Sequence, residues 1–244
     1  MAASEHGLAK AQVQSLSSGI VDQVLEALFA GKLKPGAFLG TEVQLSEIFQ
    51  TSRVPIREAL SQLAALGVLT IRTGARGGAT IAQGDPDKFA IALAVQFMLA
   101  GIGAEEIFDL RIALEGRAAE MAASRATDED IARLRALLAA VPKGKVGRRA
   151  ATEKILDFHM GIVEVSGSRT LLTLMHAIHH ALINLYLAST PDMVQPVASY
   201  PRLERILELI ASHDAESARV AMADHLESRR QEMIERLGAL PEDE

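Results

Sequence analysis

The chain has 244 residues, 49% of them hydrophobic and only 4% aromatic, with a formal net charge of −6. This length allows one large or two modest domains with a substantial core. The frequent Ala and Leu residues favour helices. The absence of cysteine excludes disulfides and thiolate metal sites.

The longest uncharged run is FAIALAVQFMLAGIGA, Phe89 to Ala104, with 16 residues. A helix that spans a bilayer needs ~20 apolar residues, so this run predicts a buried helix instead. The first residues of the chain lack the basic start and apolar core of a secretory signal peptide. We therefore expect a cytoplasmic protein without a membrane partner.

Charge is distributed unevenly along the chain. Residues 1–84 carry a net charge of +1, residues 85–244 carry −7, and the segment 51–84 alone carries +3. A small positive zone on an acidic protein is a first hint of nucleic-acid contact. The segment IAQGDPDKF, residues 81–89, contains Gly84, Asp85 and Pro86, which interrupt regular structure. It predicts a boundary between one domain at 1–84 and another at 85–244.

Helical spacing of apolar residues predicts a first helix in SGIVDQVLEALFAG, residues 18–31. LKPGAFLG (33–40) reads as a turn and a short extended stretch. TEVQLSEIFQ (41–50) predicts a short helix capped by Thr41. TSRVPIREALSQLAALG (51–67) predicts another helix, and VLTIRTGARGGATIA (68–82) predicts two strands around a glycine-rich hairpin. This order is typical of a winged helix-turn-helix.

The second of these paired helices has the pattern of a DNA-reading helix. Arg53, Arg57 and Ser61 share the face opposite its apolar residues. Arginine can bind guanine bidentately in the major groove. Thr51 and Ser52, with the N–H groups at the helix start, are suited to hold phosphate.

The hairpin carries Arg76, Gly77 and Gly78 at its tip, where glycine permits close approach to DNA. Two alternatives remain open. Arg53 and Arg57 can be an ordinary solvated helix face. GARGGAT can be a phosphate loop, although it fits neither G-x-x-x-x-G-K-[ST] nor G-x-G-x-x-G.

The stretch from Leu45 to Ala82, LSEIFQTSRVPIREALSQLAALGVLTIRTGARGGATIA, resembles the winged helix-turn-helix of GntR-type bacterial transcription regulators. The matching residues are Ser52, Arg53, Pro55, Arg57, Glu58, Ala59 and Leu60. The resemblance implies that Arg53 and Arg57 read operator DNA, with the wing from Arg76 to Gly78 assisting.

Almost all of the second domain is predicted to be helical. The expected helices cover residues 86–100, 103–125, 127–140, 150–166, 168–189, 198–212 and 214–237, and Thr127, Ser168 and Asp214 mark three of the starts. The basic stretch PKGKVGRR, residues 142–149, is expected to be a solvated loop. Short connections between amphipathic helices predict an antiparallel bundle. The fold class is therefore mainly α, with a winged helix-turn-helix followed by an all-α bundle.

Three polar residues fall on apolar helix faces. Arg111 shares a stripe with Ile107, Leu110, Leu114 and Ala118, His159 lies in EKILDFHMGIV (153–163), and His225 lies between Met222 and Leu226. A buried guanidinium needs a partner, which can be Glu115, another protein group or a ligand carboxylate. The alternatives are three satisfied core groups or the floor of a binding pocket.

The second domain is similar to the FCD effector domain of the FadR-like subgroup, through FDLRIALEGRAAEMAA (108–123), FHMGIVEVSGSRTLL (158–172) and LIASHDAESARVAMADHL (209–226). The resemblance implies a helical bundle around a cavity for a small, usually carboxylate-bearing metabolite. It also implies a homodimer formed largely through this domain. On this basis Arg111, His159 and His225 are candidate effector ligands.

Many members of this subgroup hold a divalent metal through one Asp and three His. His159 and His225 match two of these positions, but the other two are aliphatic here, at Ile155 and Leu203. We therefore expect no metal and no cofactor, with the two histidines acting directly on the effector. A substitute ligand from His176, His179 or His180 remains an alternative.

The sequence thus predicts a dimeric transcription regulator, by default a repressor, in which the effector changes operator binding. One alternative is an enzyme that uses the bundle cavity, although no nucleophile elbow, paired carboxylates or phosphate loop supports it. Another is a scaffolding helical protein, which would leave the Arg53 and Arg57 face unexplained.

Overall fold

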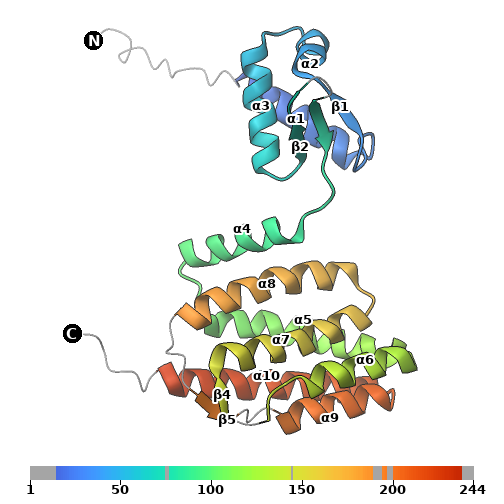
Figure 1. Ribbon diagram of the computed structural model, residues 1–244, viewed down its shortest axis with the longest axis vertical. Coiled ribbons are helices and arrows are strands. Elements are labelled where there is room, and N and C mark those ends of the chain that lie inside the picture. The colour runs from blue at the N-terminus through green and yellow to red at the C-terminus, as the bar shows by residue number, and fades with distance from the viewer. Residues whose placement is uncertain (1–14, 75–76, 144, 189–193, 197–199, 238–244) are drawn as a thin grey trace, which may run out of the picture. The chain divides into compact units, whose positions relative to one another are not determined.

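The computed structural model describes residues 15–74, 77–143, 145–188, 194–196 and 200–237. The chain divides into two compact units, residues 1–85 and residues 86–244. Both units are drawn in Figure 1. Within the described residues, no helix is both long and apolar enough to cross a membrane.

Within its described residues, 15–74 and 77–85, the first unit forms three helices and a small antiparallel sheet. In chain order its elements are α1 (Leu16–Phe29), β1 (Phe38–Gly40), α2 (Glu42–Ile48), α3 (Arg53–Ala65), β2 (Leu69–Arg72) and β3 (Gly78–Ile81). The strand order is β1-β3-β2. This is the predicted winged helix-turn-helix, with β1 as a third strand that the sequence indicated only as an extended stretch.

Local capping and apolar spacing fix these helices. Thr41 begins α2 through a capping box: its Oγ1 accepts from Gln44 N at 3.3 Å, and its own N–H donates to Gln44 Oε1 at 2.9 Å. Helix α1 packs against α3, and α3 also contacts α2 and β2. The resulting core consists of Ile20, Val21, Val24, Leu45, Ile56, Ala59, Leu60, Leu63, Leu69, Ala79 and Ile81.

The hairpin of β2 and β3 pairs Leu69 with Ile81 at one end and Arg72 with Gly78 at the other. Gly78 has a φ of 149°, and a Cβ there would lie 2.6 Å from the Phe38 ring. Only glycine therefore allows β1 to pass this closely beside the wing. Arg76 lies outside the described residues.

The second unit is a helical bundle. Its elements are α4 (Pro86–Leu99), α5 (Ala104–Arg125), α6 (Asp128–Ala139), β4 (Lys145–Gly147), α7 (Arg148–Val165), α8 (Arg169–Ala188), β5 (Val194–Pro196), α9 (Tyr200–Ala211) and α10 (Ala215–Leu237). Helix α5 contacts α7, α8, α9 and α10, so it is the central helix, whereas α4 lies along α8 (Figure 1). The mainly helical fold class predicted from the sequence is confirmed.

Side chains cap the predicted helix starts. The Thr127 hydroxyl accepts from Asp130 N at 3.2 Å, the Ser168 hydroxyl from Leu171 N at 3.3 Å, and Asp214 Oδ1 from Ser217 N at 3.2 Å. Two local expectations were wrong. Residues 145–147 form β4, which pairs antiparallel with β5, instead of a solvated loop. Leu110 is 39% exposed and does not continue the buried stripe of α5.

Candidate functional site

A hollow on the first unit lies between α3 and the wing. It brings together five of the predicted DNA-contacting residues: Arg53, Arg57 and Ser61 from α3, and Gly77 and Gly78 from the wing. Three of these, on successive turns of α3, are exposed. The sequence analysis missed other lining residues, among them Thr41, Glu42, Val43, Arg72 and Thr73.

Arg57 already has a partner in this hollow. Its Nε donates a hydrogen bond to Glu42 Oε2 at 2.7 Å, although 65% of its side chain remains exposed. A guanidinium bonded through Nε keeps its two terminal nitrogens for a planar acceptor pair such as O6 and N7 of guanine. Glu42, in the first turn of α2, therefore restricts the conformations of the Arg57 side chain. It leaves the two terminal guanidinium nitrogens of Arg57 available for a base.

Thr51 and Ser52 do not line the hollow but stand beside it, at the start of α3. Ser52 is the N-cap residue, is exposed, and makes no side-chain capping hydrogen bond. Its hydroxyl and the first N–H groups of α3 form an N-terminus of the kind that binds phosphate. The position is suited to the DNA backbone more than to base edges.

The second unit contains a small internal pocket of about 40 Å³. A single water molecule needs roughly 10–15 Å³ on this measure, so the space holds a few waters. The pocket is lined by Phe108, Arg111, Thr152, Ile155, Leu156, His159, Leu182, His225, Arg229 and Met233. Helices α5, α7 and α10 thus bring Arg111, His159 and His225 to one place, and α8 adds Leu182 to the wall.

A continuous polar chain forms the floor of this pocket. Arg111 Nε donates to Glu115 Oε1 at 2.6 Å, and the other carboxylate oxygen, Oε2, is hydrogen-bonded to His159 Nδ1. All three residues are at least 95% buried. Burial acts to raise the pKa of Glu115, but Arg111 and His159 oppose it and hold this pKa well below its usual range. Glu115, which the sequence offered as one of several partners for Arg111, is therefore a charged bridge.

Three imidazole nitrogens near the hydrogen-bonded Arg111, Glu115 and His159 side chains are buried and have no hydrogen-bond partner: His159 Nε2, His179 Nε2 and His225 Nδ1. The rings of His159 and His225 face each other with centroids 5.2 Å apart. Burial, followed by electrostatic repulsion from His159, Arg229 and Arg111, lowers the pKa of His225 far below its usual value. His225 is therefore neutral near pH 7. Unsatisfied buried polar atoms are uncommon and indicate a site completed by water or a ligand.

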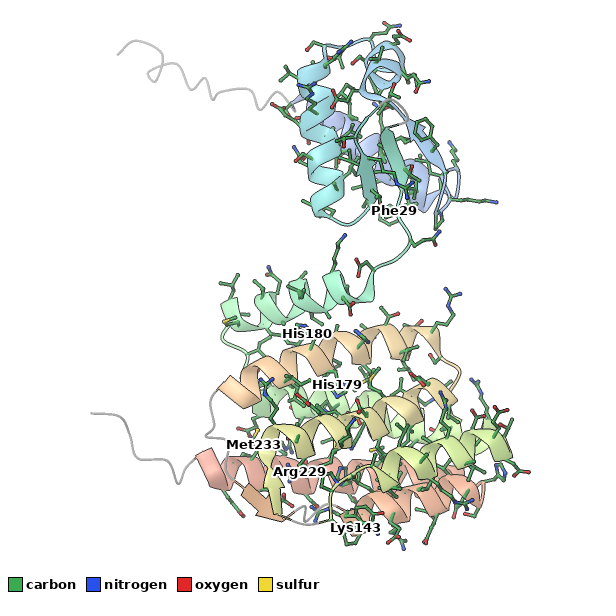
Figure 2. All side chains as sticks on the ribbon, viewed as in Figure 1. Phe29, Lys143, His179, His180, Arg229 and Met233 are labelled. Carbon is green, nitrogen blue, oxygen red and sulfur yellow. The ribbon has the colours of Figure 1, made fainter. Side chains whose placement is uncertain are left out.

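The three histidines of α8 lie in different surroundings, and two of them, His179 and His180, are labelled in Figure 2. His176 Nε2 is hydrogen-bonded to Asp87 Oδ1 on α4 at 2.7 Å, on the side of α8 that α4 covers. His179 points towards the interior, where burial, reinforced by Arg111, lowers its pKa to about 3. His180 is half-buried.

The family's metal positions are only partly brought together. Ile155 lines the pocket beside His159, whereas Leu203 is fully buried in the bundle core and does not line it. In the part of the chain that the structure describes, no three His, Cys, Asp or Glu side chains are grouped so as to hold a metal ion. The residues present do not form the family's four-ligand set, so no step is assigned to a metal.

The buried neutral histidines imply a specific pH dependence of stability. Below pH ~6.5 the unfolded chain protonates His179 and His225, whereas the folded protein does not, so stability falls as the pH falls. At about 1.4 kcal/mol per pH unit and group, acidification from pH 6.5 to 5 is expected to lower the free energy of unfolding by about 2–4 kcal/mol. Thermal unfolding across pH 5–7.5 measures this loss.

The His179→Leu variant should show a shallower slope over the same range, because one of the two groups is gone. A melting temperature that stayed constant from pH 7.5 to 5 would contradict the prediction. The pKa of Glu115 is lowered as well, so its linked loss of stability has the same sign, but this loss begins only near its ordinary pKa of 4.5, outside this window.

Comparisons with known proteins match both units. Residues 16–78 match the family of bacterial regulatory proteins called gntR, and residues 106–228 match the FCD domain. A regulator named LutR from Bacillus subtilis is 27% identical over 203 residues, covering 80% of this chain and 91% of the relative. The transcriptional repressor NanR from Enterobacter sp. is 25% identical over 222 residues, covering 88% of this chain and 84% of the relative.

A solved structure has the same fold. The GntR protein of Streptococcus agalactiae superposes with a TM-score of 0.58 at 24% identity, covering 88% of this chain and 99% of that protein. The FCD match alone spans half of the chain, and the gntR match coincides with the winged unit. The chain therefore belongs to the GntR family of bacterial regulatory proteins, as a DNA-binding transcription regulator with an FCD effector domain.

Proposed function

We propose that the protein is a cytoplasmic homodimeric repressor whose two winged units each read one half-site of a near-palindromic operator. The observation that carries this proposal is the hollow between α3 and the wing. There Arg53, Arg57 and Ser61 are exposed beside glycines that permit close approach of DNA. Arg53 and Arg57 are assigned to base edges, and Thr51 and Ser52 to phosphate. Arg76, Gly77 and Gly78 are assigned to the wing contact.

We assign the polar pocket of the second unit to a small effector that carries a carboxylate. Arg111, His159 and His225 form its floor, and the unpartnered imidazole nitrogens supply hydrogen-bonding capacity that the protein itself leaves unused. The present volume of about 40 Å³ is far below the roughly 300 Å³ of a usual ligand site. A metabolite must therefore widen the pocket, which gives the bound and free states different structures.

Helix α8 is the element that connects this pocket with α4. It contributes Leu182 to the pocket wall and, through His176, a hydrogen bond to Asp87 on α4. The winged unit ends at Asp85, and α4 begins at the next residue. A displacement of α8 on effector binding would thus be passed to α4, and operator affinity changes to the extent that the effector prefers one state.

Helix α4 is also the surface that we assign to the homodimer. Its outward face exposes apolar side chains and, from Phe89 to Leu99, contains no charge. The exposed residues are Phe89 (42%), Ile91 (52%), Val95 (41%), Met98 (62%) and Leu99 (77%). A contiguous apolar face of this kind marks an interaction surface, and a two-fold operator requires a second copy of the chain.

Charging this face should produce monomers. The double variant Ile91→Asp/Val95→Asp is expected to sediment as a monomer at concentrations where the wild type is a dimer. Val220 on α10 is equally exposed, at 41%, so Val220→Asp is the matched control and should remain dimeric. A double variant that stayed dimeric would refute the assignment of α4.

Selection of duplexes from a random DNA pool tests the function itself. The wild-type protein should enrich an inverted repeat with half-sites whose centres are about one or two helical turns apart. Enrichment of no sequence, or of an asymmetric site, would contradict the proposal. We further propose that the chain is not an enzyme, in keeping with relatives that are named transcription regulators.

A further inference from the structure

Arg229 lines the pocket of the second unit, but it is neither a predicted effector ligand nor a part of the buried floor. Arg229 lies on α10 one turn after His225, and Met233 follows one turn later (Figure 2). Thr152 of α7 lines the same space. The side chain of Arg229 is 23% exposed, whereas that of Arg111 is 6% exposed. Arg229 therefore occupies the more accessible end of the pocket.

The ion pairs around Arg229 contain two arginines but only one carboxylate, so one positive charge is not balanced. Glu232 is hydrogen-bonded to Arg229 through Oε2, and its other oxygen, Oε1, accepts from Arg202 Nη2 at 2.6 Å. One carboxylate thus serves two guanidinium groups. Burial would raise the pKa of Glu232, but Arg229 and Arg202 lower it below its usual value. The carboxylate is ionised near pH 7, yet it balances only one of its two partners.

Arg111, unlike Arg229, does not share its carboxylate with a second arginine among the described residues. Its guanidinium is bonded to Glu115, which is fully buried and has no second arginine to neutralise. A ligand carboxylate at Arg111 would have to share that guanidinium with a buried glutamate of the same charge. At Arg229 the same carboxylate would supply the negative charge that Glu232 cannot provide twice.

We propose that Arg229 binds the anionic group of the effector, and that Glu232 and Arg202 position its guanidinium. This inference deepens the effector function proposed above and depends on it. Arg111 then acts mainly through Glu115, holding His159 in place. The effector's uncharged end lies over the floor, where His159 Nε2 and His225 Nδ1 lack partners. The matching ligand class is a small carboxylic acid, with or without a second oxygen group that can reach the floor.

The test measures binding of small carboxylates to the full-length protein alone. Sodium acetate, glycolate and malonate are each compared with sodium chloride of equal ionic strength, and the melting temperature is recorded. At least one carboxylate should raise the wild-type melting temperature by roughly 2–4 °C. In Arg229→Gln this rise should vanish, with binding weakened about 10-fold or more.

Arg230→Gln is the matched control, because Arg230 is adjacent on α10 but is paired with Asp109 and Glu227 and does not line the pocket. It should respond as the wild type does. An undiminished rise in Arg229→Gln, or no rise with any carboxylate in the wild type, would overturn the inference. Operator binding of the wild type without carboxylate is measured in parallel. A wild type that binds no operator would refute the proposed function separately.

Discussion

Replacing Arg57 with alanine is expected to remove sequence-specific operator binding while leaving the fold and the proposed homodimer intact. A bidentate contact between arginine and guanine contributes about 1–3 kcal/mol of discrimination. A dimer loses it at both half-sites, so specific affinity should fall roughly 30-fold to 10⁴-fold. Fluorescence anisotropy with the selected operator and a scrambled duplex measures this difference.

The fold should survive because the side chain of Arg57 is 65% exposed and its ion pair with Glu42 lies at the surface. Such pairs contribute about 0–1 kcal/mol to stability. Gln62 is exposed on the same helix but does not line the hollow, so Gln62→Ala should bind like the wild type. If Arg57→Ala and the wild type bound the operator with equal affinity, the assignment of Arg57 to base recognition would be wrong.

The largest loss of stability is expected from Glu115→Gln. This change keeps the volume but leaves the Arg111 guanidinium buried without a counter-charge, at a cost of about 3–5 kcal/mol. For a unit of this size the melting temperature should fall by roughly 6–20 °C. Urea unfolding followed by circular dichroism measures the change in free energy.

The double variant Arg111→Met/Glu115→Gln distinguishes a missing counter-charge from a general packing defect. Methionine fills the space of the arginine stem without a charge, and glutamine can still bond to His159. We therefore expect the double variant to be more stable than Glu115→Gln alone. If the losses in free energy of unfolding caused by the two substitutions simply added, the explanation of the pocket floor by charge pairing would be wrong.

Local signals made most of the helices predictable. Thr127, Ser168 and Asp214 mark helix starts in the sequence, and each accepts a hydrogen bond from a backbone N–H in the structure. Apolar spacing in the first 82 residues likewise predicted the helices and the wing hairpin. Capping and amphipathic periodicity depend on neighbours within one or two turns, so a single sequence contains them.

Non-local pairing was not predictable in the same way. Strands β4 and β5 have three residues each and pair across about 50 positions of sequence, too short for any alternation to be visible. Glu42 and Arg57 are separated by 15 positions on different helices. Their contact depends on how α2 packs on α3.

The pocket residues likewise differ in how far the sequence alone predicts their roles. An arginine surrounded by apolar residues indicated that Arg111 is buried, and it is 5% exposed. Arg229 shares the helical spacing of Met222, His225, Leu226 and Met233, but its charged neighbours Arg230 and Glu232 are typical of a solvated helix face, and it was not among the predicted effector ligands. Its role follows only from the number of arginines that share Glu232, which requires the tertiary structure.

The pairing of Arg57 with Glu42 has a consequence for how the protein searches along DNA. Non-specific affinity grows with the number of cations that displace condensed counterions from phosphates. In the free protein the charge of Arg57 is balanced by Glu42, and the whole first 84 residues carry a net charge of only +1. Non-specific complexes should therefore be short-lived and only weakly salt-dependent, so that few molecules are retained by the competing sites of a genome.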